Sequence, residues 1–578
     1  MYGEYDIREV CQSVGRLRRE AEQLLAGNGL QPHLPAFYLG AYDSSDRLVA
    51  GGGLEGNVIK CLAINCDRRG EALANRIVSR LLERAGLDGH DNVFVFTKPA
   101  YTEQLESLSF HLIGQSSEAV LLESNPRGIA AYRDELKALR RNGRCGVAVM
   151  NCNPMTQGHL YLIRQAIQKV DTLFIIPLNS DHQEFSYAER RAILQEELKG
   201  IPQAVLCPGS DYLVSPASFP TYFIKEASRR ADAQIALDCD IFNRHIAPSL
   251  QVCCRFVGSE PQDAATARYN ELMRKELQAD TIVTERLATN GQPISASTLR
   301  RALHARHVAP SLPLAAPAAV PYVLAHAAVQ ALHDELYLSP KPGLVQPDDC
   351  GSHSDMDLSV MQRGIQAIQP YLVQIALSGF ADKMPSISSL QSIGLEAEAA
   401  MLQTTNGVNT HKGALFALGV TLAVASHCYQ TGHTVCPQRL SGLIAETACQ
   451  LSPATGTHGH AVRTEHHVAG ALDMAQSGYA PLFGQWLPYY RSLREEDPLR
   501  RHKLLLKIMC GLDDTNIYHR GGPQAAHWMQ SLARKTLPEI STDKLREMNA
   551  QLKARHLSPG GSADMLALTL FIHSITSS

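Results

Sequence analysis

The chain has 578 residues, and at roughly 150 residues per domain this length predicts about three or four domains. Hydrophobic residues make up 45% and charged residues 19%, which excludes disorder as the main state. The net charge of −3 gives no global basic field, so nucleic acid and anionic membrane surfaces are not expected partners. The 14 cysteines form no C-x-x-C pair and the N-terminus lacks an apolar signal region, which together indicate a cytoplasmic protein with reduced thiols.

Two breaks divide the chain. Residues 137–144 form a short basic turn, and residues 308–321 hold four prolines among alanines, which is typical of a semi-rigid linker. The expected domains are 1–140, 141–307 and 321–578, with residues 308–320 as the linker. The prolines and a histidine within 312–332 also argue against a membrane-spanning helix there.

The hydrophobic pattern differs between the three segments. In the first, residues 36–41, 48–53, 58–65 and 92–97 are predicted strands and 70–85 a helix, so this domain is α+β. In the second, strands 145–150, 172–178 and 203–207 alternate with helices 158–170 and 187–199, which predicts an α/β, Rossmann-like domain with a parallel sheet. In the third, apolar residues recur at helical spacing, so this domain is expected to be all-α.

A phosphate-binding motif opens the second segment. Thr156-Gln-Gly158-His159 lies where a buried strand gives way to a helix, and helix N-termini bind phosphate through free N–H groups. Gly158 allows close backbone approach, and His159 is placed to donate to an α-phosphate. A capped helix is the alternative explanation of T-x-G-H alone.

A second motif lies about 140 residues further on, at Ile294-Ser295-Ala-Ser297-Thr-Leu-Arg300. Its hydroxyls and arginine suit the β- and γ-phosphates of a leaving pyrophosphate. Together the two motifs resemble the (H/T)-x-G-H and I-S-x-x-x-x-R signatures of the nucleotidyltransferase superfamily. The order of the motifs and their βα context argue against a mere helix cap.

The strings MNCNPMTQGH, CRFVGSEP and GQPISASTLR resemble the citrate lyase ligase family more closely. This resemblance implies that residues 1–305 activate acetate as acetyl-AMP and acetylate the prosthetic-group thiol on the acyl carrier subunit of citrate lyase. It implies catalytic roles for Thr156, His159 and Arg300. The implied ATP-binding residues of this part are Asn153, Gly158, His159, Gly258, Ser295, Ser297 and Arg300.

The first segment resembles the N-terminal domain of the same family in GNVIKCLAIN and NVFVFTKP, which implies an acetyltransferase-like (GNAT) fold. Its G-x-G-x-x-G at 51–56 is followed by a strand pattern and not by a helix, so a dinucleotide site is rejected. The loop 67–72 begins with Asp67 where an acyl-CoA loop carries Gln or Arg. Docking of the carrier protein and acyl-CoA binding both stay open. Thr97-Lys98-Pro99 is either a pocket edge or a solvated surface.

Five clusters in the last segment put polar groups beside glycine or proline, which is unusual for a helical core. We expect their carboxylates to hold one or two Mg²⁺ ions and their basic residues to hold a triphosphate. The expected Mg²⁺ ligands are Asp355, Asp357, Asp513, Asp514 and Asp564, and Asp355 and Asp514 are also the catalytic candidates. The expected ATP-binding residues are Lys341, His411, Lys412 and Arg520. Asp348 and Asp349 are interpreted as a helix cap.

These clusters, in SPKPGLV, GVNTHKGALFALG, DDTN, HRGG and SPGGSADMLALTLF, resemble triphosphoribosyl-dephospho-CoA synthase over about 325–578. The family joins the ribose of ATP to the 2′-hydroxyl of dephospho-CoA and releases adenine. A carboxylate would stabilise the charge at C1″ or accept the hydroxyl proton, and the sequence does not say which aspartate does so.

One region departs from that family. Leu472 and Met474 stand where members often carry charged groups, which leaves open an impaired domain or one that uses Asp473 and Glu465. The histidines of 457–467 lack a recognised zinc spacing.

Both halves belong to one pathway, so we expect a bifunctional activation enzyme for citrate lyase. ATP, Mg²⁺, acetate and dephospho-CoA are its expected small ligands. The alternatives are an active ligase with a C-terminal binding scaffold, and a maturation factor for malonate decarboxylase.

Overall fold

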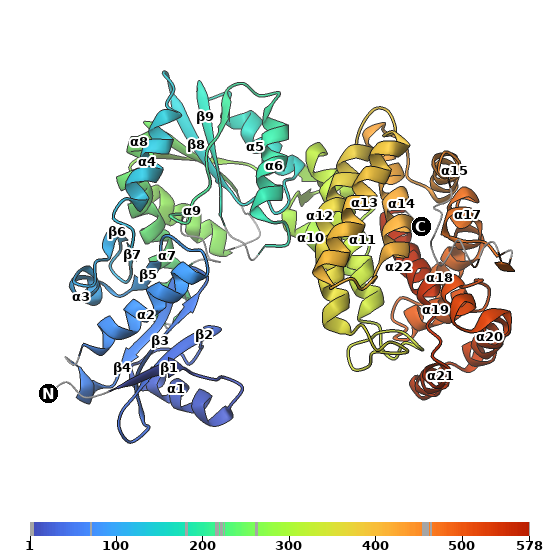
Figure 1. Ribbon diagram of the computed structural model, residues 1–578. Coiled ribbons are helices and arrows are strands. Elements are labelled where there is room, and N and C mark those ends of the chain that lie inside the picture. Colours follow the sequence, from blue (N-terminus) through green and yellow to red (C-terminus); the bar gives the residue numbers. More distant parts are fainter. Residues whose placement is uncertain are drawn as a thin grey trace. The chain divides into compact units, whose positions relative to one another are not determined.

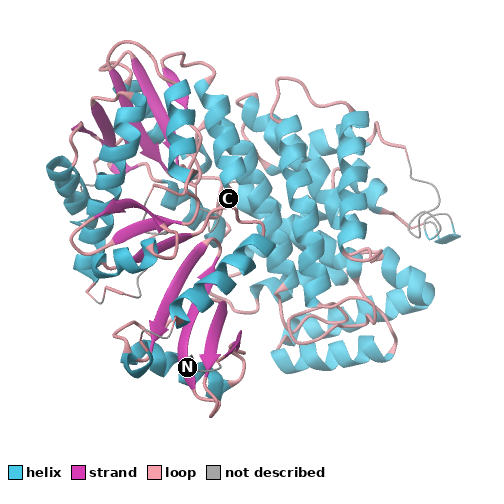
Figure 2. Ribbon diagram, turned by 60° about the vertical axis from the view of Figure 1, so that its left-hand side comes forward, coloured by secondary structure: helices cyan, strands magenta, loops and turns pink. Residues whose placement is uncertain are grey.

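The computed structural model describes residues 5–69, 72–179, 183–213, 219, 223–224, 226–259, 264–452, 462, 465–466 and 468–576. The chain forms two compact units, residues 1–294 and residues 295–578 (Figure 1). Every strand assigned in the described residues belongs to unit 1. Described unit 2 is helical apart from one isolated bridge between Gln346 and Asp349 (Figure 2). The structure confirms the expected order along the chain, in which two parts that contain both strands and helices are followed by a helical part.

Unit 1 begins with a seven-stranded sheet of order β1-β2-β3-β4-β5-β7-β6. Neighbouring strands are antiparallel except β4 and β5, which are parallel. The strands are β1 (Asp6–Glu9), β2 (Phe37–Tyr42), β3 (Leu48–Glu55), β4 (Val58–Ile64), β5 (Phe94–Thr97), β6 (His111–Gln115) and β7 (Val120–Glu123). The helices are α1 (Gly15–Gly27), α2 (Leu73–Leu87), α3 (Thr102–Glu106) and α4 (Gly128–Ala138). The four strands predicted in this segment are confirmed.

Alternation along β2 divides the core of this sheet in two. Tyr38 and Tyr42 pack with Leu24 of α1, whereas Leu39 and Ala41 pack with residues of α2 such as Ile77. Because side chains alternate between the faces of a strand, α1 and α2 cover opposite faces of the sheet.

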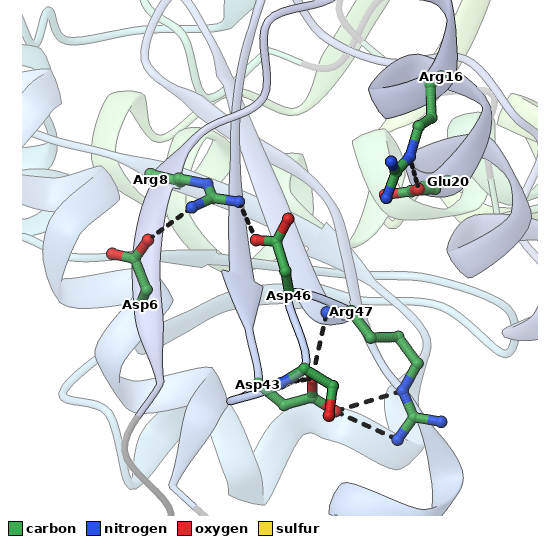
Figure 3. A network of polar contacts seen from close by, with 8 residues as sticks. Asp6, Arg8, Arg16, Glu20, Asp43, Asp46 and Arg47 are labelled. Atoms are coloured by element: carbon green, nitrogen blue, oxygen red, sulfur yellow. Dashed lines mark hydrogen bonds and ion pairs between the residues drawn. The ribbon is translucent and has the colours of Figure 1, made fainter.

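Ion pairs of this part lie on β1, on α1 and in the turn between β2 and β3. Figure 3 shows Arg8 of β1 between Asp6 and Asp46, Arg47 against Asp43, and Arg16 against Glu20 within α1. The side chains of Arg8 and Asp46 are 45% and 65% exposed, so solvent screens their attraction and they add little to stability.

The second sheet of unit 1 has five parallel strands in the order β10-β9-β8-β11-β12. They are β8 (Cys145–Met150), β9 (Thr172–Pro177), β10 (Ala204–Leu206), β11 (Cys254–Gly258) and β12 (Asp280–Thr284). The helices are α5 (Gln157–Ala166), α6 (Tyr187–Leu198), α7 (Ala227–Ile241), α8 (Ala247–Leu250) and α9 (Ala264–Glu276), and a hairpin of β13 (Ala288–Thr289) and β14 (Gln292–Pro293) follows. The predicted parallel sheet is confirmed. Its central strands are apolar throughout because helices cover both faces.

A buried carboxylate joins the two sheets of unit 1. Glu123, at the end of β7, is 1% exposed. It accepts hydrogen bonds from the Tyr212 hydroxyl at 2.5 Å, from Asn92 Nδ2 at 2.6 Å and from the Ile129 backbone at 2.9 Å. Tyr212 follows β10, so this cluster fixes the first sheet against the loops of the second.

Unit 2 is built around two nearly all-apolar helices, α14 (Lys412–Gln430) and α22 (Gly560–Ile575). Among the described residues, α14 alone is long and apolar enough to cross a membrane by length and composition, and 72% of that stretch is buried inside the structure. The other helices are α10 (Ala296–Ala305), α11 (Val320–Leu336), α12 (Leu358–Gly379), α13 (Ile387–Thr404), α15 (Pro437–Ala448), α17 (Ala471–Gln476), α18 (Leu487–Ser492), α19 (Arg500–Met509), α20 (Thr515–Thr536) and α21 (Thr542–Ala554).

The proline-rich stretch 308–320 is packed into unit 2 and does not span solvent as a linker would. Val308 and Leu312 are buried, and the Val308 backbone donates to the carbonyl of Ser574 at 2.9 Å. Pro313 and Pro317 each lie in the first turn of a short 3-10 helix. The backbone N–H that a proline lacks would have no partner within the helix at that position. Small apolar residues between the prolines allow this close packing.

Candidate active sites

The carboxyl edge of the parallel sheet presents His159 on the first turn of α5. Thr156 is the N-cap, and its backbone N–H donates to His159 Nδ1 at 3.0 Å, with Thr156 Oγ1 2.9 Å from the same atom. A backbone N–H can only donate, so Nδ1 is the acceptor and the neutral ring carries its proton on Nε2. Burial, and secondarily the charge of Arg286, lower the pKa of His159 to about 4. At neutral pH the ring is therefore uncharged and offers an Nε2–H donor.

Asn153 lies in the loop before α5, where its side chain fixes the loop itself. It is buried, accepts from the Phe185 backbone at 3.0 Å and donates to Gln183 at 2.6 Å. Arg190 of α6 completes this arrangement by donating to the carbonyls of Phe185, Asn151 and Leu178. The sequence analysis missed Arg190, whose only local signal is an arginine at a position that faces the core.

Of the two glycines predicted to bind ATP, Gly158 has a tight protein neighbour and Gly258 has only ordinary van der Waals neighbours. A Cβ on Gly158 would lie 3.2 Å from the carbonyl oxygen of Ile294, the residue that opens the second motif. A Cβ on Gly258, at the end of β11, would lie 3.6 Å from Nε of Arg286. Arg286 follows β12 at the same edge of the sheet, and the sequence analysis missed it. An arginine just beyond a strand of a parallel sheet is the signal that could have found it.

The second motif forms the start of α10 in unit 2. Ser295 is the N-cap, its Oγ accepts from the Ser297 backbone at 3.2 Å, and the two hydroxyl oxygens are 2.7 Å apart. Arg300 lies three residues beyond Ser297, on the same side of the helix. This end of α10 combines hydroxyls, the positive end of a helix dipole and an arginine, which suits an anion. The joint action of this motif with His159 stays a prediction.

Unit 2 contains a cavity of about 980 Å³. Seven of the predicted residues line it together: Lys341, His411, Lys412, Asp513, Asp514, Arg520 and Asp564. Asp355 and Asp357 do not line it. The Asp355 side chain is 62% exposed, and Asp357 caps α12 by accepting from the Val360 backbone at 2.9 Å. Of the five predicted Mg²⁺ ligands, three therefore reach the cavity.

Lys341 and Glu335 form a buried ion pair in the cavity wall. Both are almost fully buried, and Lys341 Nζ also donates to the Glu335 carbonyl at 2.8 Å. Burial lowers the pKa of Lys341, and the attraction of Glu335 opposes this effect. The sequence analysis did not single out Glu335. It lies in α11, outside any glycine or proline cluster.

His411 faces the cavity as a neutral side chain. Burial, with smaller effects of Lys341 and His333, lowers its pKa to about 3. Its Nδ1 lies 2.9 Å from Thr410 Oγ1, and its buried Nε2 has no hydrogen-bond partner. An uncharged ring cannot neutralise a triphosphate, but its free nitrogen can make one hydrogen bond to a ligand.

Asp514 accepts hydrogen bonds from the N-terminal ends of two helices. Its carboxylate accepts from Asn516 N at 3.1 Å at the start of α20, and from Gly561 N at 3.2 Å, Ser562 N at 2.7 Å and Ser562 Oγ at 2.9 Å at the start of α22. Burial raises the pKa of Asp514, and the Ser562 bonds oppose the rise. With four donors on two oxygens, this side chain holds α20 against α22.

Asp564 is more open to a ligand. Its Oδ2 lies close against Gly413 at the N-terminal end of α14, and a Cβ added at Gly413 would be only 2.1 Å from this oxygen. Burial raises its pKa well above the usual value, and repulsion from Asp514 and Glu335 adds to the rise. Among the described residues, no three His, Cys, Asp or Glu side chains form a group that could hold a metal ion by themselves.

The remaining basic candidates, Lys412 and Arg520, form an ion pair and hydrogen bonds with residues of the protein. Lys412 is ion-paired with Glu398 of α13, and Arg520 donates to the carbonyls of Ser352 at 3.1 Å and His556 at 3.2 Å. Both side chains keep solvent-exposed surface, so both can turn towards an anion.

Leu472, Asp473 and Met474 of α17 also line the cavity, whereas the Glu465 side chain is 74% exposed. Most of the histidine-rich stretch 457–467, and Gly70 and Glu71 of the first segment's loop, lie outside the described residues.

Two family models match this chain. The citrate lyase ligase C-terminal domain matches residues 145–319, and the family described as ATP:dephospho-CoA triphosphoribosyl transferase matches residues 321–578.

Named relatives match the same two parts. The [citrate [pro-3S]-lyase] ligase of Escherichia coli (strain K12) is 34% identical over 336 residues, which is 56% of this chain and 94% of the relative. The 2-(5''-triphosphoribosyl)-3'-dephosphocoenzyme-A synthase of Klebsiella pneumoniae is 34% identical over 264 residues, 42% of this chain and 87% of the relative. That of Haemophilus ducreyi (strain 35000HP / ATCC 700724) is 36% identical over 286 residues, 44% of this chain and 88% of the relative.

Solved structures are less similar. A putative acyl-CoA N-acyltransferase from Klebsiella pneumoniae covers 21% of this chain and 95% of its own, at 15% identity and a TM-score of 0.18. A pantoate-beta-alanine ligase from Francisella tularensis covers 30% and 70%, at 13% identity and a TM-score of 0.21. The two family models and the relatives that the chain covers almost fully make it a member of both families, a fusion of a citrate lyase ligase with a triphosphoribosyl-dephospho-CoA synthase.

Proposed function

We propose that this chain is a bifunctional enzyme that matures and activates citrate lyase through two ATP-consuming reactions at separate sites. One reaction makes the precursor of the prosthetic group, and the other acetylates the finished group. Membership of both families in one chain is the observation that carries this function. The free cysteines and the nucleotide substrates are in keeping with a cytoplasmic enzyme.

In the ligase reaction, an acetate oxygen attacks the α-phosphate of ATP, which gives acetyl-AMP and pyrophosphate. The thiol of the prosthetic group on the acyl carrier subunit then attacks the acetyl carbon and AMP leaves. His159 supports this assignment because its fixed tautomer leaves an Nε2–H donor available for the negative charge that grows on the α-phosphate. Arg286, beside His159 and Gly258, adds positive charge. Ser295, Ser297 and Arg300 serve the pyrophosphate.

In the synthase reaction, the bond between C1″ of the ATP ribose and adenine breaks, and its electron pair leaves with adenine. The 2′-oxygen of dephospho-CoA bonds to C1″ and releases its proton. A cavity of about 980 Å³ lies at the upper end of the range for one ligand, which suits two nucleotides together. Lys412 and Arg520 attract the triphosphate, and the carboxylates stabilise positive charge at C1″.

The donor chemistry of the cavity fits a magnesium nucleotide. Mg²⁺ is usually held by one or two carboxylates plus substrate phosphates, and Asp513 and Asp564 both line the cavity. A cation there would also relieve the repulsion that Asp514 and Glu335 exert on Asp564. Mg²⁺ would supply charge neutralisation for the triphosphate.

The finer fold assignments rest on topology. The parallel order β10-β9-β8-β11-β12 with a phosphate-type loop after β8 supports a nucleotidyltransferase-like domain in 141–307. The mixed sheet, parallel only between β4 and β5, supports a GNAT-like domain in 1–140.

Two variants of the full chain test the assignment of the two sites. His159→Ala should abolish acetylation of deacetylated citrate lyase and spare adenine release, and Asp564→Asn should do the reverse. His111→Ala, at an exposed strand position, and Asp543→Asn, at an 89% exposed side chain, are the matched controls.

Adenine is measured by chromatography after incubation with ATP and dephospho-CoA. Loss of both activities in a folded His159→Ala protein would contradict two separate sites. Absence of adenine from the wild type, with dephospho-CoA still bound, would favour the scaffold alternative.

A further inference from the structure

The cavity of unit 2 has a charged end and an apolar end. Its charged groups come from loops and from the N-terminal ends of α14, α20 and α22, as with Lys412, Asp514 and Asp564. Along α14 the lining then changes from Gly413 to Phe416 and Val420. At 1.5 Å per residue, the apolar end lies about 10 Å from the charged end. Phosphates can use only the charged end.

Helix α13 lines the apolar end and is itself largely open to solvent. Ile387, Gln391 and Leu395 are four residues apart and therefore share one face, and all three line the cavity together with Leu390. Leu395 is 67% exposed, and in α13 only Ala397 and Met401 are fully buried. This face spans about 12 Å from Ile387 to Leu395. An apolar surface of this length, open beside a cavity, is typical of a binding surface.

A further apolar part of the lining comes from α17. Leu472 and Met474 are half-buried and line the cavity at positions where the synthase family often carries charges. Their side chains add to the apolar surface that α13 offers in the same cavity.

Resting on the proposed synthase activity, we propose that this surface of α13 and α17 binds the pantetheine arm of dephospho-CoA. Dephospho-CoA is ADP with a pantetheine arm on its terminal phosphate. The arm is the long uncharged part of either substrate. It carries two amides, for which Gln391 lies in the middle of the apolar face.

Adenine fits this surface less well. It is bonded directly to the ribose, so it stays beside the reacting centre at the charged end. The arm begins beyond the diphosphate and extends away from that centre. Because the two ends are about 10 Å apart, the apolar end can be reached by the arm but not by adenine.

The test compares dephospho-CoA with ADP, which lacks the arm but keeps the nucleotide. Calorimetry gives the Kd of each ligand for the full-length wild type, Leu395→Ser, Leu472→Gln and the control Leu377→Ser. Leu377 is also an exposed leucine, on α12, but it does not line the cavity. We expect Kd for dephospho-CoA to rise about tenfold in both cavity variants, with ADP binding unchanged and no effect of the control.

Equal weakening of both ligands would overturn the inference, because the surface would then hold the nucleotide. No change for either ligand would overturn it too. Adenine release is measured on the same proteins. A wild type that releases no adenine refutes the synthase activity, while the two Kd values still decide whether the arm binds here.

Discussion

Replacing Lys341 by methionine should destabilise unit 2 far more than an ordinary surface substitution does. Methionine is of similar length but cannot pair with Glu335. Glu335 is only 5% exposed, so its carboxylate would stay buried without its cation. Removing one partner of a buried pair typically costs about 3–5 kcal/mol.

The double variant Lys341→Met/Glu335→Leu should recover most of this loss, since an apolar replacement of a buried pair is often close to neutral. The coupling energy from the cycle of two single variants and the double variant should be about 2 kcal/mol or more. Lys544→Met is the control: it removes an ion pair with Glu539, whose side chain is 79% exposed, and should change stability very little.

Tryptophan fluorescence reports the unfolding of unit 2 separately from that of unit 1. The chain has 2 tryptophans, Trp486 and Trp528, and both lie in unit 2. Trp486 is buried, so its emission should shift as unit 2 unfolds in urea. A Lys341→Met midpoint equal to wild type, or a double variant as unstable as the sum of the single variants, would refute the buried pair.

Three further predictions test other parts of the chain. Because the folded-state pKa of His159 is about 4 and the unfolded value about 6.5, protonation favours the unfolded chain. Stability is therefore lost as pH falls, and His159 contributes about 1 kcal/mol of that loss between pH 7.5 and 5.5; this contribution should be absent in His159→Asn, by urea unfolding followed by circular dichroism. Gly413→Ala would place a Cβ 2.1 Å from Asp564 Oδ2 and should abolish adenine release, whereas Gly442→Ala, with open space, should not. Arg190→Ala leaves three carbonyls unpaired and should cost at least about 3 kcal/mol in unit 1, by hydrogen exchange; a smaller cost would contradict its anchoring role.

Features that depend on neighbours in sequence were predictable. The strands β8 and β9 are apolar runs of a length typical of a covered parallel sheet, and the helices of the last segment repeat apolar residues at helical spacing. Thr156 and His159 are three residues apart at a helix start, so their pairing is a local property of the chain. The motif strings around them were therefore sufficient to indicate both families.

The limits of the sequence appear at residues whose partners are distant. Aspartates 355 and 357 were expected in one cluster with Asp514 and Asp564, but a carboxylate beside a helix start also makes a good cap, and Asp357 is used that way. Asp514 was expected to bind a metal, which stays a prediction; its carboxylate also accepts a hydrogen bond from Ser562, 48 residues further along the chain, and so joins the start of α20 to that of α22.

What the sequence by itself determined is the class of each segment and the chemistry of its motifs, because helix periodicity, capping and strand hydrophobicity act over a few residues. What only the tertiary structure decided is which charges share a low-dielectric space. Arg286 beside His159, Glu335 beside Lys341, and the apolar wall of α13 and α17 each arise from packing between residues far apart in the chain. Burial makes such pairings strong, and no local pattern specifies them.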